Sequence, residues 1–248
     1  VSPYLGWLGW HHIAGLVGGI FVFTWMFSGW LSLNPGGAFS GRGMTREIAT
    51  GYSGHDAPDI VAEFRSPPSI SAVEARFVWI GGRPLMLLDD SSGRRSLADP
   101  ATGAPVALPR DEIIAAARRA MPGAAMTSVH QLDEPDAYWY TLHHQRELPV
   151  LRIGFDDPAH TWLHISPVTA EILDRSDDSR RSYRWLFSAL HSLDFPLLLR
   201  IWPARDVVVW LLSVVGTVVS ISGIVIGWRR LRRKVRSCAV DARVSRLS

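Results

Sequence analysis

Two adjacent histidines open a long apolar stretch near the start of the chain, in the segment LGWHHIAGLVGG. On an α-helix His12 shares a face with Gly15 and Gly19. His11 shares a face with Gly15 and Gly18. A small-residue groove admits a neighbouring backbone or a flat macrocycle, and an imidazole above such a groove is what axial ligation of a haem iron requires. The alternative is an interfacial pair that reaches lipid headgroups and water.

A second candidate ligand, His191, lies in the segment YRWLFSALHSLDFPLLL. Aromatic and apolar residues recur there at helical spacing, which predicts an amphipathic helix on the outer membrane surface. Asp194 follows three residues later and is a possible orienting partner for one ring nitrogen. A structural histidine hydrogen-bonded to Asp194 is the competing interpretation.

Geometry limits how these histidines combine. His12 and Leu33 are separated by 21 residues, or roughly 30 Å at the helical rise, which is the thickness of the hydrocarbon core. His12 and His191 are therefore not expected to ligate the same haem. Either each histidine supplies one ligand of a separate haem site that another chain or another protein completes, or only one of the two histidines binds haem.

The elements that must position these side chains are two apolar segments. Residues 5–33 hold few strongly polar side chains and residues 207–228 hold no charge, so each exceeds the roughly 20 residues that a membrane-spanning helix needs. The arginine-rich segment 228–236 predicts a cytoplasmic C-terminus by the positive-inside rule. Two spans then place both termini in the cytoplasm and the central domain in the periplasm. The sequence pI of about 9.4 reflects this anchor and does not indicate nucleic-acid binding.

Between the spans the sequence predicts an α+β domain. Residues 110–121 have the periodicity of a short amphipathic helix, and strand-like runs follow it. These runs cover residues 125–132, 137–144, 149–155 and 161–165. A degenerate internal repeat aligns residues 83–106 with residues 148–173, so that two copies of one small sheet unit are expected. The alignment places Pro100, Thr102 and Gly103 opposite Pro167, Thr169 and Ala170.

The segments MPGAAMTSV, DPATG and SPVTAE resemble those of PepSY modules, with a degenerate first copy. The apolar flanks resemble the helices of the PepSY-associated transmembrane family of iron-regulated bacterial membrane proteins. The resemblance covers nearly the whole chain. It implies an inner-membrane protein that carries haem b between histidines, bound here by His11, His12, Gly15, Gly19 and His191, with iron ligation by His12 and His191. Longer relatives have a further N-terminal helix and domain.

The expected organisation has seven parts: transmembrane helix 1–34, linker 35–57, degenerate PepSY-like unit 58–108, PepSY-like unit 109–176, interfacial helix 177–203, transmembrane helix 204–228 and basic tail 229–248. A stripe of small residues in the second span predicts a partner helix. It comprises Ser213, Gly216, Ser220, Gly223 and Gly227. The partner is the first span, a second copy of the chain, or an N-terminal half that precedes Val1.

Two functions remain open. The first, which the resemblance implies, is electron transfer through haem to a periplasmic ferric siderophore. The second is a non-catalytic membrane-anchored module that binds a peptide, a protease or an envelope partner. Metal or siderophore contact through the outer histidines is a further interpretation, although polar strand residues are the commoner reason for such a pattern. They are His143, His144, His160 and His164.

Overall fold

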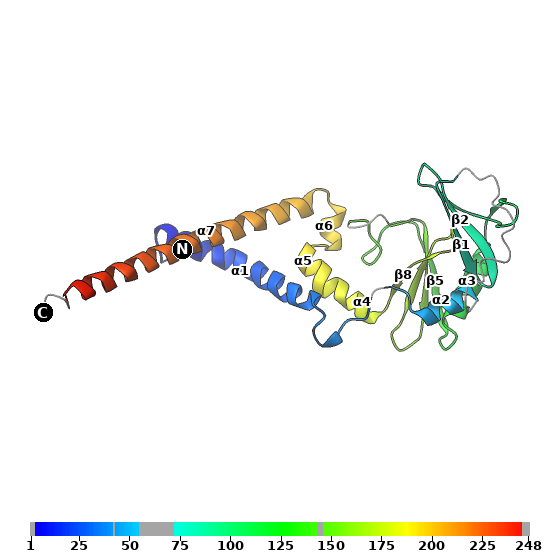
Figure 1. Ribbon diagram of the computed structural model, residues 1–248, viewed down its shortest axis with the longest axis horizontal. Coiled ribbons are helices and arrows are strands. Elements are labelled where there is room, and N and C mark those ends of the chain that lie inside the picture. The colour runs from blue at the N-terminus through cyan, green and yellow to red at the C-terminus, as the bar shows by residue number, and fades with distance from the viewer. Residues whose placement is uncertain (1–2, 42, 55–71, 143–145, 245–248) are drawn as a thin grey trace. The chain divides into compact units, whose positions relative to one another are not determined.

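The computed structural model describes residues 3–41, 43–54, 72–142 and 146–244, and it divides the chain into two compact units. One unit joins Val1–Gly36 to Arg184–Ser248, and the other is Gly37–Tyr183. Figure 1 shows the first unit as helices and the second as strands with short helices. The coarse expectation of apolar terminal helices around an α+β region is confirmed.

The helical unit is built on two long helices that pack against each other, α1 (Gly6–Ser32) and α7 (Ala204–Val244). Between α1 and the strand-rich unit lies one short turn, η1 (Pro35–Gly37). The chain re-enters the helical unit through three short segments. They are the wide turn η2 (Arg184–Ala189), α5 (Leu190–Ser192) and α6 (Pro196–Arg200).

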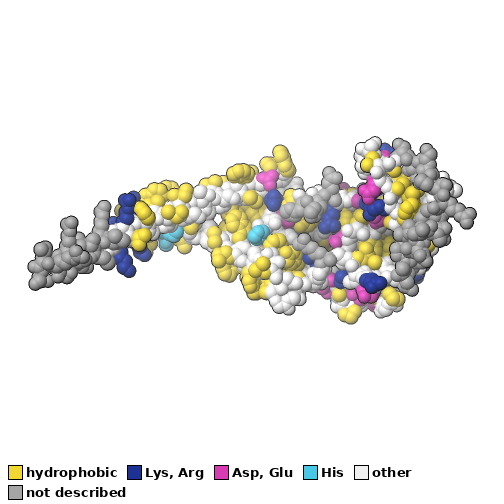
Figure 2. All heavy atoms as spheres, viewed as in Figure 1, with side chains coloured by type: hydrophobic (Ala, Val, Ile, Leu, Met, Phe, Trp, Pro, Cys, Tyr) yellow, Lys and Arg dark blue, Asp and Glu magenta, His cyan; other side chains and the backbone are white. Residues whose placement is uncertain are grey.

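Both long helices meet the length and hydropathy of a membrane span. Only 17% of the apolar window of α1 and 6% of that of α7 is buried within the protein, whereas the core helix of a water-soluble protein would be mostly covered. Figure 2 shows hydrophobic side chains along the outside of these helices. Apolar surface of this extent is suited to contact with lipid.

The prediction of a single interfacial helix over residues 183–199 is wrong. The helical path from α4 (Asp178–Tyr183) through η2 and α5 ends because Leu193 adopts a left-handed conformation with φ of 57°. A new helix, α6, then begins with Pro196 in its first turn, where the missing N–H of proline is tolerated.

The second unit contains two four-stranded antiparallel sheets, each with its strands in sequence order. The first sheet comprises β1 (Glu74–Ile80), β2 (Arg83–Asp89), β3 (Arg95–Ala98) and β4 (Pro105–Val106). The second comprises β5 (Met126–Leu132), β6 (Val150–Phe155), β7 (Trp162–Ile165) and β8 (Ile172–Ser176). Each is preceded by a helix, α2 (Arg46–Ser53) or α3 (Arg110–Ala120). Helix α2 lies within the range expected to be a linker.

The aligned turns of the two sheets have the same backbone conformation. The N–H of Gly103 donates to the carbonyl of Asp99, and the N–H of Ala170 donates to the carbonyl of Ser166. Gly103 and Ala170 both have positive φ, at 72° and 51°. The two sheets therefore share strand number, strand order and the conformation of this turn, in agreement with the expected repeat.

The expected strand over residues 137–144 is absent from its described part, residues 137–142. Asp136 accepts hydrogen bonds from the N–H groups of Tyr138 and Trp139, which turns the chain out of an extended path. Trp139 is then buried, and its indole donates to the carbonyl of Glu147. Burial of a large aromatic ring therefore replaces strand pairing at this position.

Candidate histidine sites

His11 lies in the contact between the two long helices. Its Nδ1 is 2.9 Å from the hydroxyl of Ser222 and 3.2 Å from the carbonyl oxygen of Val219, both on α7. A Cβ atom added to Gly223 would lie 3.5 Å from Cε1 of the imidazole, so the ring rests over this glycine. The glycine under His11 thus belongs to the opposite helix and not to the predicted groove of its own helix.

His191 is held in a similar way at a different place in the helical unit. Its Nδ1 is 3.1 Å from the hydroxyl of Ser28 on α1, and its ring stacks on Phe187 with 4.8 Å between centroids. Asp194, the partner expected from sequence, instead has its carboxylate 3.5 Å from the guanidinium of Arg205. The imidazole is therefore oriented by a neighbouring helix and by an aromatic ring.

The hydrogen bonds of the two serines favour one tautomer of each ring. Ser222 donates its hydroxyl hydrogen to carbonyls of its own helix, and Ser28 donates its own to the carbonyl of Trp25. A hydroxyl engaged in this way accepts from an imidazole N–H, which favours a proton on Nδ1 of His11 and of His191. No described residue hydrogen-bonds to Nε2 in either ring.

His12, Gly15 and Gly19 lie away from the helix contact. His12 packs the edge of its ring against Tyr4 at 5.2 Å, and a Cβ atom added to Gly15 or Gly19 would have no atom within 4 Å. Gly18 differs, because its added Cβ would lie 2.6 Å from Val215 of α7. The structure therefore places His11 with Gly18 on the packed face of α1, and His12 with Gly15 and Gly19 on the open face.

The two histidine positions are far apart, as the helical rise predicts. Ser28, which contacts His191, follows His11 by 17 residues on a continuous helix, or about 25 Å. Figure 2 shows histidine side chains at two separate places on the helical unit. His11 and His191 thus cannot bind one iron within one chain.

The small-residue stripe of α7 does not form the contact with α1, and that part of the expectation is wrong. Only Gly223 of its members meets α1, through His11, whereas Gly216 and Gly227 have no atom within 4 Å of an added Cβ. The hydroxyls of Ser213 and Ser220 are exposed and bond to carbonyls of α7 itself. The packed face lies beside the stripe, at Val215, Val219 and Ser222.

Charged side chains lie next to the backbone that carries His191. Arg184 is buried and donates to the carbonyl of Asp194, while Arg205 donates to the carbonyl of Ser192 at 3.0 Å. Arg205 also pairs with the fully buried carboxylate of Asp194 at 3.5 Å and with the carboxylate of Asp206 at 3.1 Å. Two guanidinium groups and two carboxylates therefore lie near this backbone, and their charges balance.

His164 is held in the opposite way to His11 and His191. Its Nε2 accepts a hydrogen bond of 2.8 Å from Arg152, and its ring stacks on Trp139 at 4.6 Å. The side chain is 1% exposed, and burial, together with the adjacent Arg152, lowers its pKa to about 3. A neutral imidazole whose lone pair is already engaged is a structural residue.

The other outer histidines form no described metal site. His160 has positive φ and precedes β7, and its Nδ1 is 2.6 Å from the carboxylate of Asp178. His143 and His144 lie outside the described residues. Within the described ranges no three His, Cys, Asp or Glu side chains gather as ligands for a single ion.

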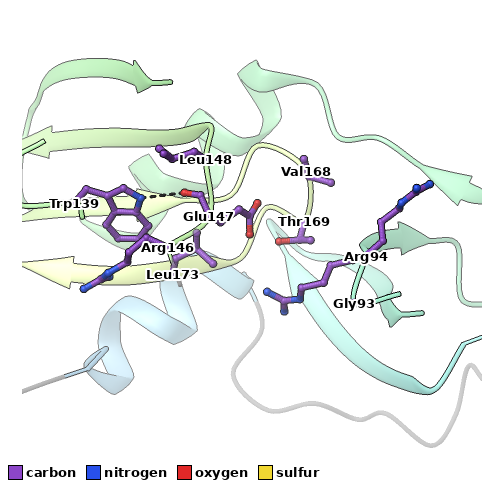
Figure 3. Close-up of a pocket in the computed structure, with 10 residues that line it drawn as sticks. Gly93, Arg94, Trp139, Arg146, Glu147, Leu148, Val168, Thr169 and Leu173 are labelled. Atoms are coloured by element: carbon purple, nitrogen blue, oxygen red, sulfur yellow. Dashed lines mark hydrogen bonds between the residues drawn. The ribbon is translucent and has the colours of Figure 1, made fainter. Parts of the chain in front are cut away.

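A pocket of about 710 Å³ lies in the strand-rich unit, between elements of the two sheets. Figure 3 shows Trp139, Arg146 and Glu147 on one side, Gly93 and Arg94 on the other, and the turn at Thr169 between them. Arg146 stacks over Trp139 at 4.3 Å and lies 3.6 Å from the carboxylate of Asp174. Arg95, which also lines the pocket, is paired with Glu171 and Asp89. Opposite charges are thus mixed within the lining.

Sequence reasoning missed Ser28 and Ser222. Both are fully buried hydroxyls in otherwise apolar helices, which is an expensive placement unless the hydroxyl has partners. A serine within a predicted span therefore indicates a polar partner on another segment. The hydrophobic pattern does not predict that this partner is a histidine more than 160 residues away in sequence.

Comparison of the chain with protein-family models, with curated protein sequences and with solved structures gave no match.

Proposed function

We propose that this chain is a bacterial inner-membrane protein that holds haem b at histidines of its helical unit and passes electrons to a periplasmic ferric siderophore. The observation that carries the proposal is the orientation of His11 and His191. In each, Nδ1 contacts a hydroxyl of another helix, and no described residue hydrogen-bonds to Nε2. A second hydrogen bond through the non-ligating nitrogen is the usual arrangement of a histidine that binds a metal.

The membrane placement rests on the exposed apolar surface of α1 and α7. The arginines from Arg229 to Arg236 directly follow the apolar part of α7, which favours a cytoplasmic C-terminus. Two spans would then put both termini in the cytoplasm and the strand-rich unit in the periplasm. The lipid bilayer is accordingly the first partner of the chain.

Each of the two sites supplies one imidazole as a ligand for a haem iron, so the residues present fit one of the two ligands that the iron needs. Bound haem would supply an iron that changes between the ferric and ferrous states and so accepts and releases single electrons. His11 and His191 would each ligate one iron, and the geometry favours His11 over the more loosely held His12. The second ligands would come from another copy of the chain or from another membrane protein.

The strand-rich unit would present the ferric siderophore. We propose that its two sheets are PepSY-like modules, which the matched turns at Gly103 and Ala170 support. The pocket beside Trp139 also favours the second candidate function, a non-catalytic module. Its apolar surface and mixed charges suit a peptide at least as well as a chelate.

Hemin titration of the detergent-purified chain tests the proposal. The wild-type chain is expected to bind hemin, and H11A and H191A are each expected to remove part of the absorbance, with a smaller loss in H12A. H160A is a matched control, because His160 is an exposed histidine of the other unit. Unchanged binding in both H11A and H191A would refute the assignment of these ligands, and no hemin binding by the wild-type chain would favour the non-catalytic module.

A further inference from the structure

His11 and His191 each contact a fully buried serine of another segment. Ser222 and Ser28 have 0% exposed surface, and their hydroxyls meet Nδ1 of His11 and His191 at 2.9 and 3.1 Å. Nearby hydroxyls on the same helices are exposed and satisfied by their own backbone, as at Ser220. The two buried serines are therefore distinguished by the histidines they touch.

We propose that Ser28 and Ser222 are positioning residues that hold the two imidazoles in the Nδ1–H tautomer, so that Nε2 is presented to iron. The inference rests on the proposed function for the identity of the metal, but the tautomer itself belongs to the chain. Each serine donates to carbonyls of its own helix and is left as an acceptor. An acceptor beside Nδ1 favours the form in which Nδ1 carries the proton.

The two sites are not equally dependent on their serine. Nδ1 of His11 has a second acceptor in the carbonyl of Val219 at 3.2 Å, and a carbonyl can never donate. For His191, the serine supplies the described hydrogen bond to Nδ1. Removal of the hydroxyl should therefore affect His191 much more than His11.

Nitrogen NMR of the metal-free, full-length chain with ¹⁵N-labelled histidine tests this directly. S28A is expected to move the His191 signal from the Nδ1–H form towards the Nε2–H form, and S222A is expected to leave His11 in the Nδ1–H form. S28T, which restores a hydroxyl, should return the wild-type signal. S32A and S220A are matched controls, because both serines bond only to their own helix at exposed positions.

Hemin affinity gives the second readout, measured at one site at a time. In the H11A background S28A should weaken binding by about 10–100-fold, the usual effect of losing an outer hydrogen-bond partner of a metal ligand. In the H191A background S222A should weaken it by less than about 10-fold, because the carbonyl of Val219 remains.

The outcomes separate the two proposals. A His191 signal that does not change in S28A, or that changes equally in S32A, overturns the positioning role. A tautomer change in a chain that binds no hemin supports the positioning role and overturns the proposed function.

Discussion

His164 of the strand-rich unit and His191 of the helical unit are each held through a different ring nitrogen. The contact is at Nε2 in His164 and at Nδ1 in His191. Arg152 donates to Nε2 of His164, and the ring is sealed against Trp139. Nδ1 of His191 lies 3.1 Å from the hydroxyl of Ser28, and the residue is exposed. The neighbour of the imidazole therefore decides its role. A guanidinium donor consumes the lone pair, whereas a hydroxyl acceptor leaves it available to a metal.

The neighbours themselves differ because the two units differ. In the second sheet, Arg152 of β6 is the cross-strand partner of His164, so strand register brings a charged donor to the ring. In the helical unit the group beside Nδ1 of each ring is instead a serine hydroxyl that also bonds to its own helix.

The largest expected effect is on haem binding. The double variant H11A/H191A should lose the hemin-dependent absorbance of the six-coordinate form, because both open Nε2 atoms are removed. H164A should keep that absorbance, since its lone pair is already engaged by Arg152. A hemin titration of the two variants in detergent compares them. Loss of hemin binding in H164A alone would show that the strand-rich unit, and not the helical unit, supplies the ligand.

The next effect is on stability. H164A should lower the free energy of unfolding by about 2–3 kcal/mol, because a buried charged donor loses its acceptor and Trp139 loses its stacking partner. H191A should change it far less, because the ring is exposed. Thermal unfolding followed by near-ultraviolet circular dichroism measures both, and an equal loss in the two variants would contradict the structural role given to His164.

Acid should destabilise the strand-rich unit through His164. Its pKa is lowered from 6.5 to about 3 by burial, so the stability it contributes is present above pH 6.5 and is lost as the pH falls towards 3. The loss approaches about 1.4 kcal/mol per pH unit within that window. Burial raises the pKa of the neighbouring Asp174, which acts with the opposite sign. Unfolding midpoints measured against pH should show a flatter profile in H164Q, and identical profiles would exclude His164 as the source.

The smallest effect distinguishes the two faces of α1. G18L should destabilise the helical unit by about 1–2 kcal/mol, because its side chain overlaps Val215. G19L should cost less stability, because its position is open, and it should leave hemin binding unchanged, because Gly19 lies on the open face of α1 whereas His11 lies on the packed face. Melting temperature and hemin affinity measured for both variants check this, and a G19L chain that binds hemin more weakly would instead place the macrocycle on the open face beside His12.

Much of the fold could be predicted because it depends on local pattern. The spans follow from apolar length, and the two sheets follow from alternating runs and the turn at Asp99 that recurs at Ser166. The strand expected around Trp139 failed because burial of that ring depends on His164, which lies far along the chain. The pairing of the two histidines with Ser28 and Ser222 could not be predicted either. It depends on which faces of distant helices are in contact, and the local sequence does not determine this.

The central claim is that the Nε2 atoms of His11 and His191 bind haem iron. A reduced-minus-oxidised absorption spectrum of the full chain, purified in detergent and given hemin, measures this most directly. We predict the split α and β bands of six-coordinate haem, diminished in H11A and in H191A. A preparation that remains colourless after hemin addition would contradict the claim.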